Sequence, residues 1–435
     1  MHGTYDLSQA QITALDASDA GLPGGLWLGF FFACLLLLPP LPFPVGNSGA
    51  HVAPFVALLG VPGSVRALRR RQPVTQALPF LLLLFLAALL VSVGFAAAYS
   101  GWKIALGSLA RVLLFGVGVC LFFHGLTGPR GEDWDALRFA RVLLGIGLAG
   151  AAFACIDFYF QFHVPAGFAM QLVWLKSGVV RRAQGVFYEA GTLGNFCAFF
   201  LVMILVAAFP LRRRICPPAL LAAGALIFGT ALILSGSRAS VAAVVVAGCA
   251  FAVLRRVRIA GVLAAIAACL GAAAVVRVAV PAFWANYWFR LAGSATGVWS
   301  YPNEVLSGRL ANWKVLVYFL MQHPWHLLFG IGYKTIPYTS YIGAHVVADN
   351  TWLSLLVETG IVGVAVFAAL NVAILRTSLR AARSHRGEAA FFGIWIFCFW
   401  CGEMVQMLTA DVITYWRVLP VYFWVLATAA RESGQ

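Results

Sequence analysis

Long apolar runs recur along this chain, and they restrict its fold more than any other feature. A run of about 20 residues crosses about 30 Å of hydrocarbon as a helix, and a helix satisfies its own backbone hydrogen bonds within lipid. The sequence therefore predicts an all-α membrane protein with about 12 transmembrane helices. The expected spans are residues 26–45, 50–63, 77–99, 104–125, 139–160, 192–210, 217–236, 239–254, 259–280, 351–375, 389–409 and 412–430.

Prolines complicate the first of these spans. Pro39, Pro40 and Pro42 lie within residues 26–45, and proline interrupts a helix because it has no backbone N–H. The second span, at residues 50–63, is short. These two segments could therefore form a broken or re-entrant pair instead of two complete spans.

The composition excludes a soluble globular protein. Charged residues make up only 10% of the chain and hydrophobic residues 62%, whereas about a quarter of the residues of a soluble domain are charged. A net charge of +15 would suggest a nucleic-acid partner for a soluble protein. Here most arginines lie in short loops between spans, so we assign the charge to membrane orientation and expect no nucleic acid.

The basic clusters fall in alternating loops. Loops rich in Lys and Arg face the cytoplasm, and every cluster lies in an even-numbered loop, which predicts that both termini are cytoplasmic. The clusters are Arg66, Arg69, Arg70 and Arg71; Arg130 and Arg138; Arg212, Arg213 and Arg214; Arg255, Arg256 and Arg258; and Arg376, Arg380, Arg383 and Arg386. The alternation supports the number of spans, because an error in that number would disrupt it.

Two of the expected outside loops are long, at residues 161–191 and 281–350. The second contains Trp284, Trp288 and Trp299 among other tryptophans and tyrosines. A disordered linker would be poor in aromatic residues, and Trp and Tyr favour the membrane interface. We therefore expect this loop to fold into short helices on the membrane surface.

A set of outside or intramembrane cations does not follow the orientation rule. Ionisable groups at membrane depth are costly and often functional, and a guanidinium matches phosphate oxygens in bidentate pairs. Several arginines on one face therefore suit a pyrophosphate; the alternative is structural pairing with acidic residues. The cations are Arg181, Arg182, Arg238, Arg277, Arg290, Arg309, Lys314, Lys334 and Arg417, and the acidic residues are Asp157, Glu189, Glu304, Asp349, Glu403 and Asp411.

Two short motifs place some of these charges at expected helix ends. The first places Arg182, Glu189 and Asn195 around a glycine-rich helix entrance, and free N–H groups at a helix start bind anions, although glycine there is also ordinary capping. The second is the turn at residues 235–240, which holds Arg238 between two spans. Arg238 could bind substrate charge there or extend to lipid headgroups.

The large loop ends in a polar segment before the tenth span. Asp349 stands at the outer start of that span, where a carboxylate could deprotonate a sugar hydroxyl or simply cap the helix. Asn350 could also cap it. His345 lies four residues earlier and is either a second candidate base or a structural residue. The preceding Gly330-Ile-Gly332 is interpreted as a turn, because it lacks the context of a nucleotide-binding fingerprint.

Three segments together resemble the O-antigen ligase/polymerase superfamily of bacterial envelope glycosyltransferases. Arg182–Asn195 has an R-x-x-G-x-F…G-N pattern, and Ser235–Arg238 reads SGSR. Ser307–Gly363 contains SGR, FGIG and DNTWL…ETGIVG. The order of these segments and the position of the large loop are also similar to the family.

The resemblance implies a multi-pass protein of the bacterial inner membrane with a periplasmic active site. Residues 1–25 would be a cytoplasmic segment, 26–280 transmembrane helices 1 to 9, 281–350 a large periplasmic loop, and 351–435 helices 10 to 12 with a short cytoplasmic tail. The donor would be a glycan on undecaprenyl pyrophosphate, transferred without a metal or cofactor.

The resemblance also implies roles for the outside residues. In such enzymes outside arginines bind pyrophosphate, and a base at the start of the helix after the large loop activates the acceptor hydroxyl. The catalytic candidates are then Asp349 and His345, and the substrate-binding candidates are Arg181, Arg182, Glu189, Arg238, Arg309, Lys334 and Asn350. Ligases typically have His directly before the Asn; the Asp349-Asn350 pair of this chain is more similar to repeat-unit polymerases.

Three functions remain open at this stage. The first is a polymerase of exopolysaccharide or O-antigen repeat units, for which a flippase and a chain-length regulator would be partners. The second is a ligase that moves the glycan from the same donor to lipid A core or to a protein. The third is a transporter or flippase, although that class usually shows two comparable halves and a charged site at the membrane midplane.

Overall fold

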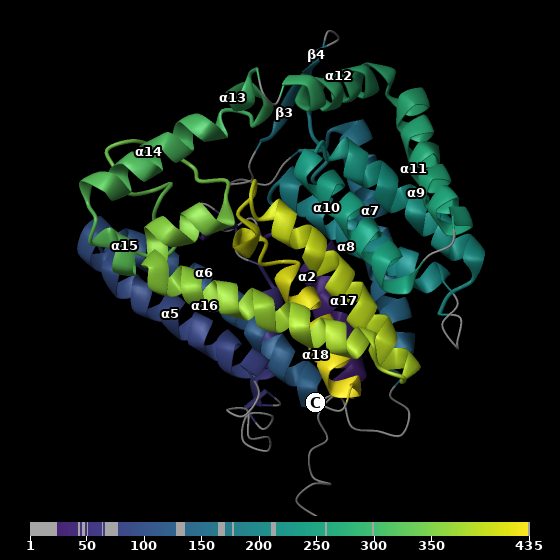
Figure 1. Cartoon of the computed structure of the whole chain (residues 1–435), viewed down its shortest axis with the longest axis horizontal. Helices are drawn as coiled ribbons and strands as arrows, with labels where there is room; N and C mark the ends of the chain where they lie inside the picture. The colour runs from purple at the N-terminus through teal and green to yellow at the C-terminus, as the bar shows by residue number, and fades with distance from the viewer. Residues whose placement is uncertain are drawn as a thin grey trace, which may run out of the picture.

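The computed structural model describes residues 24–41, 44–45, 48–49, 51–62, 64–65, 77–127, 135–163, 170–175, 178–209, 215–256, 259–297 and 300–433. Helices dominate this part of the chain and lie side by side in a bundle (Figure 1). Seven of them are long and apolar enough to cross a membrane. The predicted helical, multi-pass membrane protein is confirmed, whereas the number of 12 spans stays a prediction.

The seven long helices share an almost uncharged, strongly apolar sequence. They are α5 (Ala77–Ser100), α6 (Trp102–Thr127), α7 (Ala136–Phe160), α8 (Ala190–Ala208), α10 (Arg238–Arg255), α16 (Thr351–Ala382) and α17 (Gly387–Gln406). Further helices of the bundle are α2 (Gly24–Leu37), α9 (Pro218–Leu234), α11 (Ile259–Ala279) and α18 (Leu419–Glu432).

The first two expected spans have different bounds in the structure. Helix α2 ends at Leu37, before the prolines that stop it, and strands β1 (Pro44–Val45) and β2 (Ser48–Gly49) pair after it. Helix α3 covers only Ala53–Leu58 and is about 9 Å long, too short to cross a bilayer. The expected bounds 26–45 and 50–63 are therefore wrong for the described residues, and the broken pair is the better interpretation.

Two other segments also differ from the sequence prediction. The outside loop expected at 161–191 contains an antiparallel hairpin, β3 (Leu172–Leu175) and β4 (Gly178–Arg181), although no strand was expected. The last helix, α18, begins at Leu419 instead of residue 412, because a 3-10 turn at Val412–Thr414 precedes it. Both differences lie where the chain leaves the apolar layer and local turns replace helical periodicity.

Large aromatic side chains fill the centre of the bundle. Helix α17 packs against α10 and α16, and α18 packs against α6. Trp395 and Trp424 are fully buried, and the Trp395 ring lies 4.5 Å from that of Phe199. The Trp395 indole N–H donates to the backbone carbonyl of Phe199 at 2.9 Å, so this buried polar group has a partner within the core.

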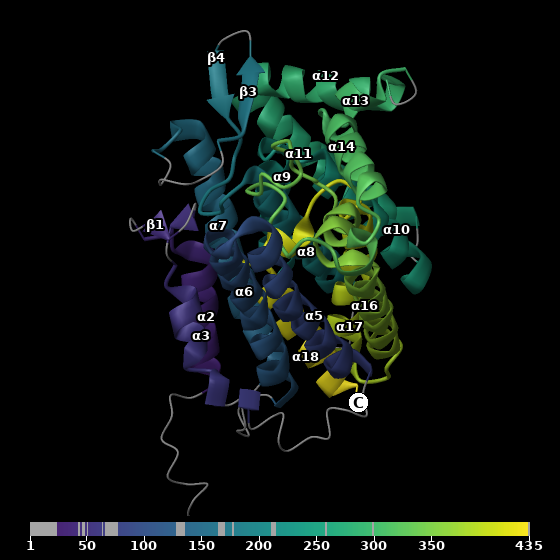
Figure 2. The ribbon, with the colours of Figure 1, turned by 90° about the vertical axis from the view of Figure 1, so that its left-hand side faces the viewer.

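The two ends of the bundle differ in structure. One end, here the loop end, carries β3–β4 and the helices of the large loop (Figure 2). These helices are α12 (Pro281–Gly297), α13 (Pro302–Val305), α14 (Arg309–Gln322) and α15 (His326–Phe329). The C-terminus lies at the opposite end (Figures 1 and 2), where an Arg386 guanidinium N–H donates to the backbone carbonyl of Glu432 at 3.1 Å. The basic α16–α17 turn therefore lies at the end away from the large loop.

Candidate functional site

Helix α16 is interrupted near the loop end, and the large loop docks at the interruption. Gly360 has φ 68° and ψ −171° inside the helix, so carbonyls one turn before it lack their helical partners. The large loop supplies replacement donors. The Ile331 N–H donates to the Val357 carbonyl at 3.0 Å, and the Gly332 N–H donates to the Glu358 backbone carbonyl at 2.8 Å. Two parts of the family-like segment Ser307–Gly363 thus hydrogen-bond to each other.

This close approach requires glycine on both sides. A Cβ atom on Gly360 would lie 2.2 Å from the backbone carbonyl of Leu328, and one on Gly330 would lie 2.3 Å from the backbone of Glu358. Both glycines also have positive φ, which other residues adopt at a cost. The Gly330–Gly332 segment is irregular backbone that bends at Ile331, and a turn at residues 333–334 follows it and carries the buried Lys334.

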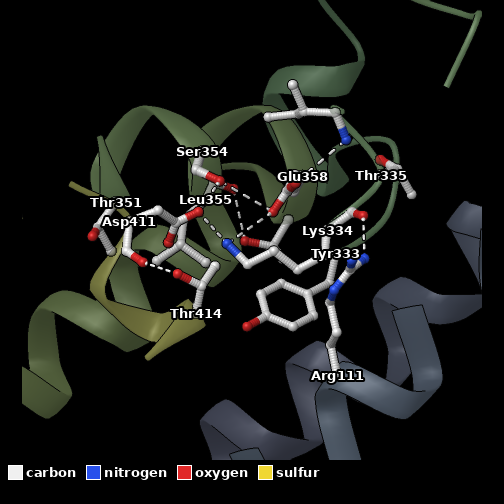
Figure 3. Close-up of polar contacts among 12 residues, drawn as sticks. Arg111, Tyr333, Lys334, Thr335, Thr351, Ser354, Leu355, Glu358, Asp411 and Thr414 are labelled. Carbon is white, nitrogen blue, oxygen red and sulfur yellow. Dashed lines mark hydrogen bonds and ion pairs between the residues drawn. The ribbon is translucent and has the colours of Figure 1, made fainter. Parts of the chain in front are cut away.

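Lys334 lies in a buried cluster with two carboxylates (Figure 3). Its ammonium group pairs with the Asp411 carboxylate and lies 3.9 Å from a Glu358 carboxylate oxygen. The Ser354 hydroxyl lies 3.2 Å from Glu358 and 3.0 Å from Asp411. The side chains of Lys334, Glu358 and Asp411 are 6%, 1% and 16% exposed. We call these four residues the Lys334 cluster; it joins the large loop, α16 and the α17–α18 segment.

Helix α6 supports the Lys334 cluster through an arginine. One Arg111 guanidinium N–H donates to the backbone carbonyl of Lys334 at 3.3 Å, and a second donates to the Tyr338 hydroxyl at 2.6 Å. The guanidinium also lies over the Tyr338 ring, 4.7 Å from its centroid. Arg111 thus fixes the backbone on which Lys334 stands, and Lys334 itself has positive φ.

A second ion pair, Arg309–Asp349, is more accessible. The Arg309 Nε lies 3.1 Å from an Asp349 carboxylate oxygen, and the two side chains are 28% and 44% exposed. Arg309 begins α14, and that helix is fixed to the segment before α16 because the Trp313 indole N–H donates to the Ala348 carbonyl at 2.6 Å. Solvent or a ligand can therefore reach both charges, unlike those of the Lys334 cluster.

The residues around the start of α16 are held in an unusual backbone. Asp349 has φ 42°, a left-handed conformation that Asp tolerates better than most residues. The Asn350 side chain caps the helix: its oxygen accepts from the Leu353 N–H at 3.0 Å, and its amide donates to the Leu408 carbonyl at 2.9 Å. Capping by Asn350 is thus confirmed, and Asp349 is turned toward Arg309.

Arg182 and Glu189 lie on the segment between β4 and α8, which packs on the turn after α9. The Arg182 Nε donates to the Ser235 carbonyl at 2.5 Å, and a Cβ on Gly236 would lie 3.1 Å from that nitrogen. Glu189 directly precedes α8, and the Thr192 hydroxyl donates to its carboxylate at 3.5 Å. Two further family-like segments, Arg182–Asn195 and Ser235–Arg238, are therefore in contact.

Glu189 is electrostatically coupled to the other carboxylates of this end. Its pKa is raised to about 7: burial is the largest cause, the negative charges of Asp349 and Asp411 add to it, and the positive charge of Arg182 and the hydrogen bond from Thr192 oppose them. The Glu189 side chain is nevertheless partly accessible. Glu189, Asp349 and Asp411 therefore share one electrostatic environment, although they lie on three separate segments of the chain.

Arg238 connects the turn after α9 with the large loop. Its guanidinium donates to the Val305 carbonyl at 2.6 Å and to the Ser307 hydroxyl at 3.0 Å. A small surface pocket beside it is lined by Arg238, Gly236 and Tyr287, together with Val173, Phe283 and Asn286. Burial raises the pKa of the Tyr287 phenol, while the charges of Arg182 and Arg238 lower it, so the two arginines act on the same place.

Two predicted site residues lie outside this arrangement. Arg181 forms a buried ion pair with Asp157 at 2.8 Å, with both side chains under a tenth exposed, and it also donates to the Phe162 carbonyl at 3.0 Å. These contacts fit the structural alternative considered for each outside arginine. His345 is exposed on the segment that leads to Asp349.

Apart from Lys334, the residues of the Lys334 cluster were not predicted as site residues. Asp411 was considered only as a structural partner, and Glu358 and Arg111 were not singled out. Arg111 could have been found, because an arginine inside an expected span is a functional candidate. The contact between Lys334 and Asp411 joins residues 77 positions apart, and no local pattern indicates such a contact.

The fold and this site define a polytopic helical membrane protein with paired charges gathered at one end of the bundle. A family model described as O-antigen ligase matches residues 223–368. The match covers α10 to α14, the docked turn and the interrupted part of α16, and it confirms the resemblance to the O-antigen ligase/polymerase superfamily. A comparison with curated protein sequences gave no significant match.

Proposed function

We propose that this protein is a glycosyltransferase that polymerises lipid-linked repeat units of an exopolysaccharide or O-antigen. The donor is a glycan on undecaprenyl pyrophosphate, and the reaction takes place at the periplasmic face of the bacterial inner membrane. The partners are the donor, a growing glycan as acceptor and the bilayer, with a flippase and a chain-length regulator acting before and during elongation.

The convergence of the family-like segments at the loop end carries this proposal. Arg182 contacts the turn that holds Arg238, Arg238 contacts Ser307, and Arg309, two residues further on, pairs with Asp349. Segments more than 150 residues apart in sequence, Arg182 and Asp349 among them, thus supply three arginines and several carboxylates to one region.

The arginines suit a pyrophosphate donor. Guanidinium groups bind phosphate oxygens in bidentate pairs, and fixed cations stabilise a leaving group as negative charge develops on it. Arg309 is partly exposed, and Arg182 and Arg238 are held by backbone carbonyls. Such fixed arginines need little reorganisation when the pyrophosphate arrives, which favours the transition state.

The transfer step needs a leaving group and a proton acceptor. The acceptor hydroxyl oxygen attacks the anomeric carbon of the donor sugar, and the bond from that carbon to the pyrophosphate oxygen breaks. Undecaprenyl pyrophosphate leaves with the electron pair, and a carboxylate of the site takes the hydroxyl proton. Asp349 and His345 are the candidates that the sequence offers for this base, and Glu189 lies in the same electrostatic environment as Asp349.

Arginine variants test the donor site. Purified Arg182→Ala and Arg309→Ala proteins are expected to insert normally and to elongate glycans about 100-fold more slowly, the usual cost of removing one group that stabilises developing charge. Arg141→Ala is the control, since Arg141 lies near the start of α7, far from the loop end, and pairs with Asp135 at 3.9 Å. Unchanged elongation by both site variants would contradict the donor site.

A further inference from the structure

We propose that Glu189 is the group that accepts the proton of the attacking hydroxyl, and that Asp349 instead orients Arg309 toward the donor pyrophosphate. This inference rests on the proposed glycosyl transfer. It assigns separate roles to three carboxylates that share one environment, those of Glu189, Asp349 and Asp411.

Two of the three carboxylates already neutralise a cation. Asp349 pairs with Arg309 at 3.1 Å. Asp411 pairs with Lys334 and also accepts a hydrogen bond from the Ser354 hydroxyl at 3.0 Å. Protonation of either aspartate would remove the negative charge that compensates its cation. Proton uptake at Asp349 would also release Arg309 at the step in which the leaving group needs that positive charge.

Glu189 differs from both in its contacts. Within the described part of the chain its carboxylate accepts a hydrogen bond from the neutral Thr192 hydroxyl at 3.5 Å, and no ion pair within 4.0 Å involves it. It lies between Arg182, seven residues earlier, and the start of α8. This places a partly accessible carboxylate in the field of Arg182, one of the arginines that would hold the donor.

A tyrosine and a glycine shape the surroundings of Glu189. A Cβ on Gly191 would lie 2.9 Å from the Tyr415 hydroxyl oxygen and 3.9 Å from the Glu189 carboxyl carbon, so both groups lie against this glycine. Tyr415 belongs to the same α17–α18 segment as Asp411. Glu189 therefore lies near both that segment and the start of α8.

Burial and the charges around Glu189 bring its pKa close to neutral pH. Arg182 and Tyr188, on its own segment, interact with it electrostatically. So do Asp349, on the segment before α16, and Asp411 and Tyr415, on the α17–α18 segment. Burial and the two aspartates outweigh Arg182 and raise the pKa to about 7. A base with a pKa near the working pH combines an available ionised form with a strong pull on the proton.

The test is the pH dependence of transfer by purified full-length protein with undecaprenyl-pyrophosphate-linked repeat units. For the wild-type protein kcat/KM is expected to rise with pH and to level off above about 7. Glu189→Gln should lower kcat by at least about 100-fold, remove the rise and keep the affinity for undecaprenyl pyrophosphate within about threefold. Glu189→Asp should recover part of the rate and restore the pH-dependent rise.

Asp349→Asn and a remote variant complete the comparison. Asp349→Asn should weaken undecaprenyl pyrophosphate binding and lower the rate while keeping the rise with pH. Glu388→Gln, in the first turn of α17 at the opposite end, should behave as wild type. A Glu189→Gln protein with wild-type kcat, or an Asp349→Asn protein that loses the rise, would overturn the assignment and leave the proposed function standing. A wild-type protein without any transfer would overturn both.

Discussion

The Lys334 cluster and the Arg309–Asp349 pair are both ion pairs between a cation and carboxylates, but they differ in their exposure to solvent. In the first, the side chains of Lys334, Glu358 and Asp411 are 6%, 1% and 16% exposed; in the second, Arg309 and Asp349 are 28% and 44% exposed. Buried ion pairs are costly to break because one charge is left uncompensated, whereas exposed pairs contribute little stability. From this difference we propose a structural role for the cluster and a substrate-binding role for the pair.

The largest effect is expected from breaking the buried cluster. Lys334→Ala leaves Asp411 and Glu358 without their cation, so we expect a loss of about 3–5 kcal/mol in the free energy of unfolding, together with loss of activity. Unfolding in a denaturing detergent, followed by circular dichroism, measures it. Adding Asp411→Asn should recover part of the loss, because it removes one of the uncompensated charges.

Lys314→Ala is the matched control for this prediction, because Lys314 is exposed on α14. It should change the unfolding free energy by less than about 0.5 kcal/mol. Equal effects of the Lys334 and Lys314 substitutions would refute the distinction between a buried structural cluster and an accessible site. They would also return Lys334 to the substrate-binding role that the sequence indicates.

Breaking the exposed pair should separate stability from activity. Arg309→Ala is expected to cost less than about 1 kcal/mol of unfolding free energy while slowing transfer about 100-fold. Arg141→Ala removes a pair of similar exposure, with side chains 49% and 36% exposed, and should change neither quantity. A large loss of stability in Arg309→Ala, with activity falling in proportion, would make this pair structural as well.

The smallest effect concerns Glu189 and the pH dependence of stability. Its pKa rises from 4.5 to about 7 on folding, so the folded protein holds a proton that the unfolded chain releases. Stability is therefore lost as pH rises between these two values. Glu189→Gln should leave stability unchanged near pH 4 and increase it by on the order of 2 kcal/mol above pH 7, as thermal unfolding at a series of pH values would show. An equal change in stability near pH 4 and above pH 7 would contradict this prediction.

The sequence predicted those features that depend on local chemistry. Apolar runs predicted the helical membrane protein, and Asn350 was correctly interpreted as a helix cap. The end of α2 before Pro39 follows from the missing N–H of proline. Family-like motifs also indicated that Arg182, Arg238 and Arg309 belong to one region.

The sequence could not predict which charges pair across long distances. Arg181 and Arg182 are neighbours with equal charge, yet Arg181 pairs with Asp157 while Arg182 contacts the turn after α9. Lys334 was expected either to bind substrate or to pair with an acidic residue, and its partner Asp411 lies 77 positions away along the chain. Such choices depend on the packing of remote helices, which hydrophobic periodicity does not contain.

The most direct measurement is glycan transfer by the purified protein in detergent, with undecaprenyl-pyrophosphate-linked repeat units as the sole substrate and no energy source. We predict longer glycans and a matching release of undecaprenyl pyrophosphate. Transfer only when lipid A core or a protein is added would indicate a ligase with the same donor. Movement of the lipid-linked glycan across proteoliposomes without any transfer would contradict the account.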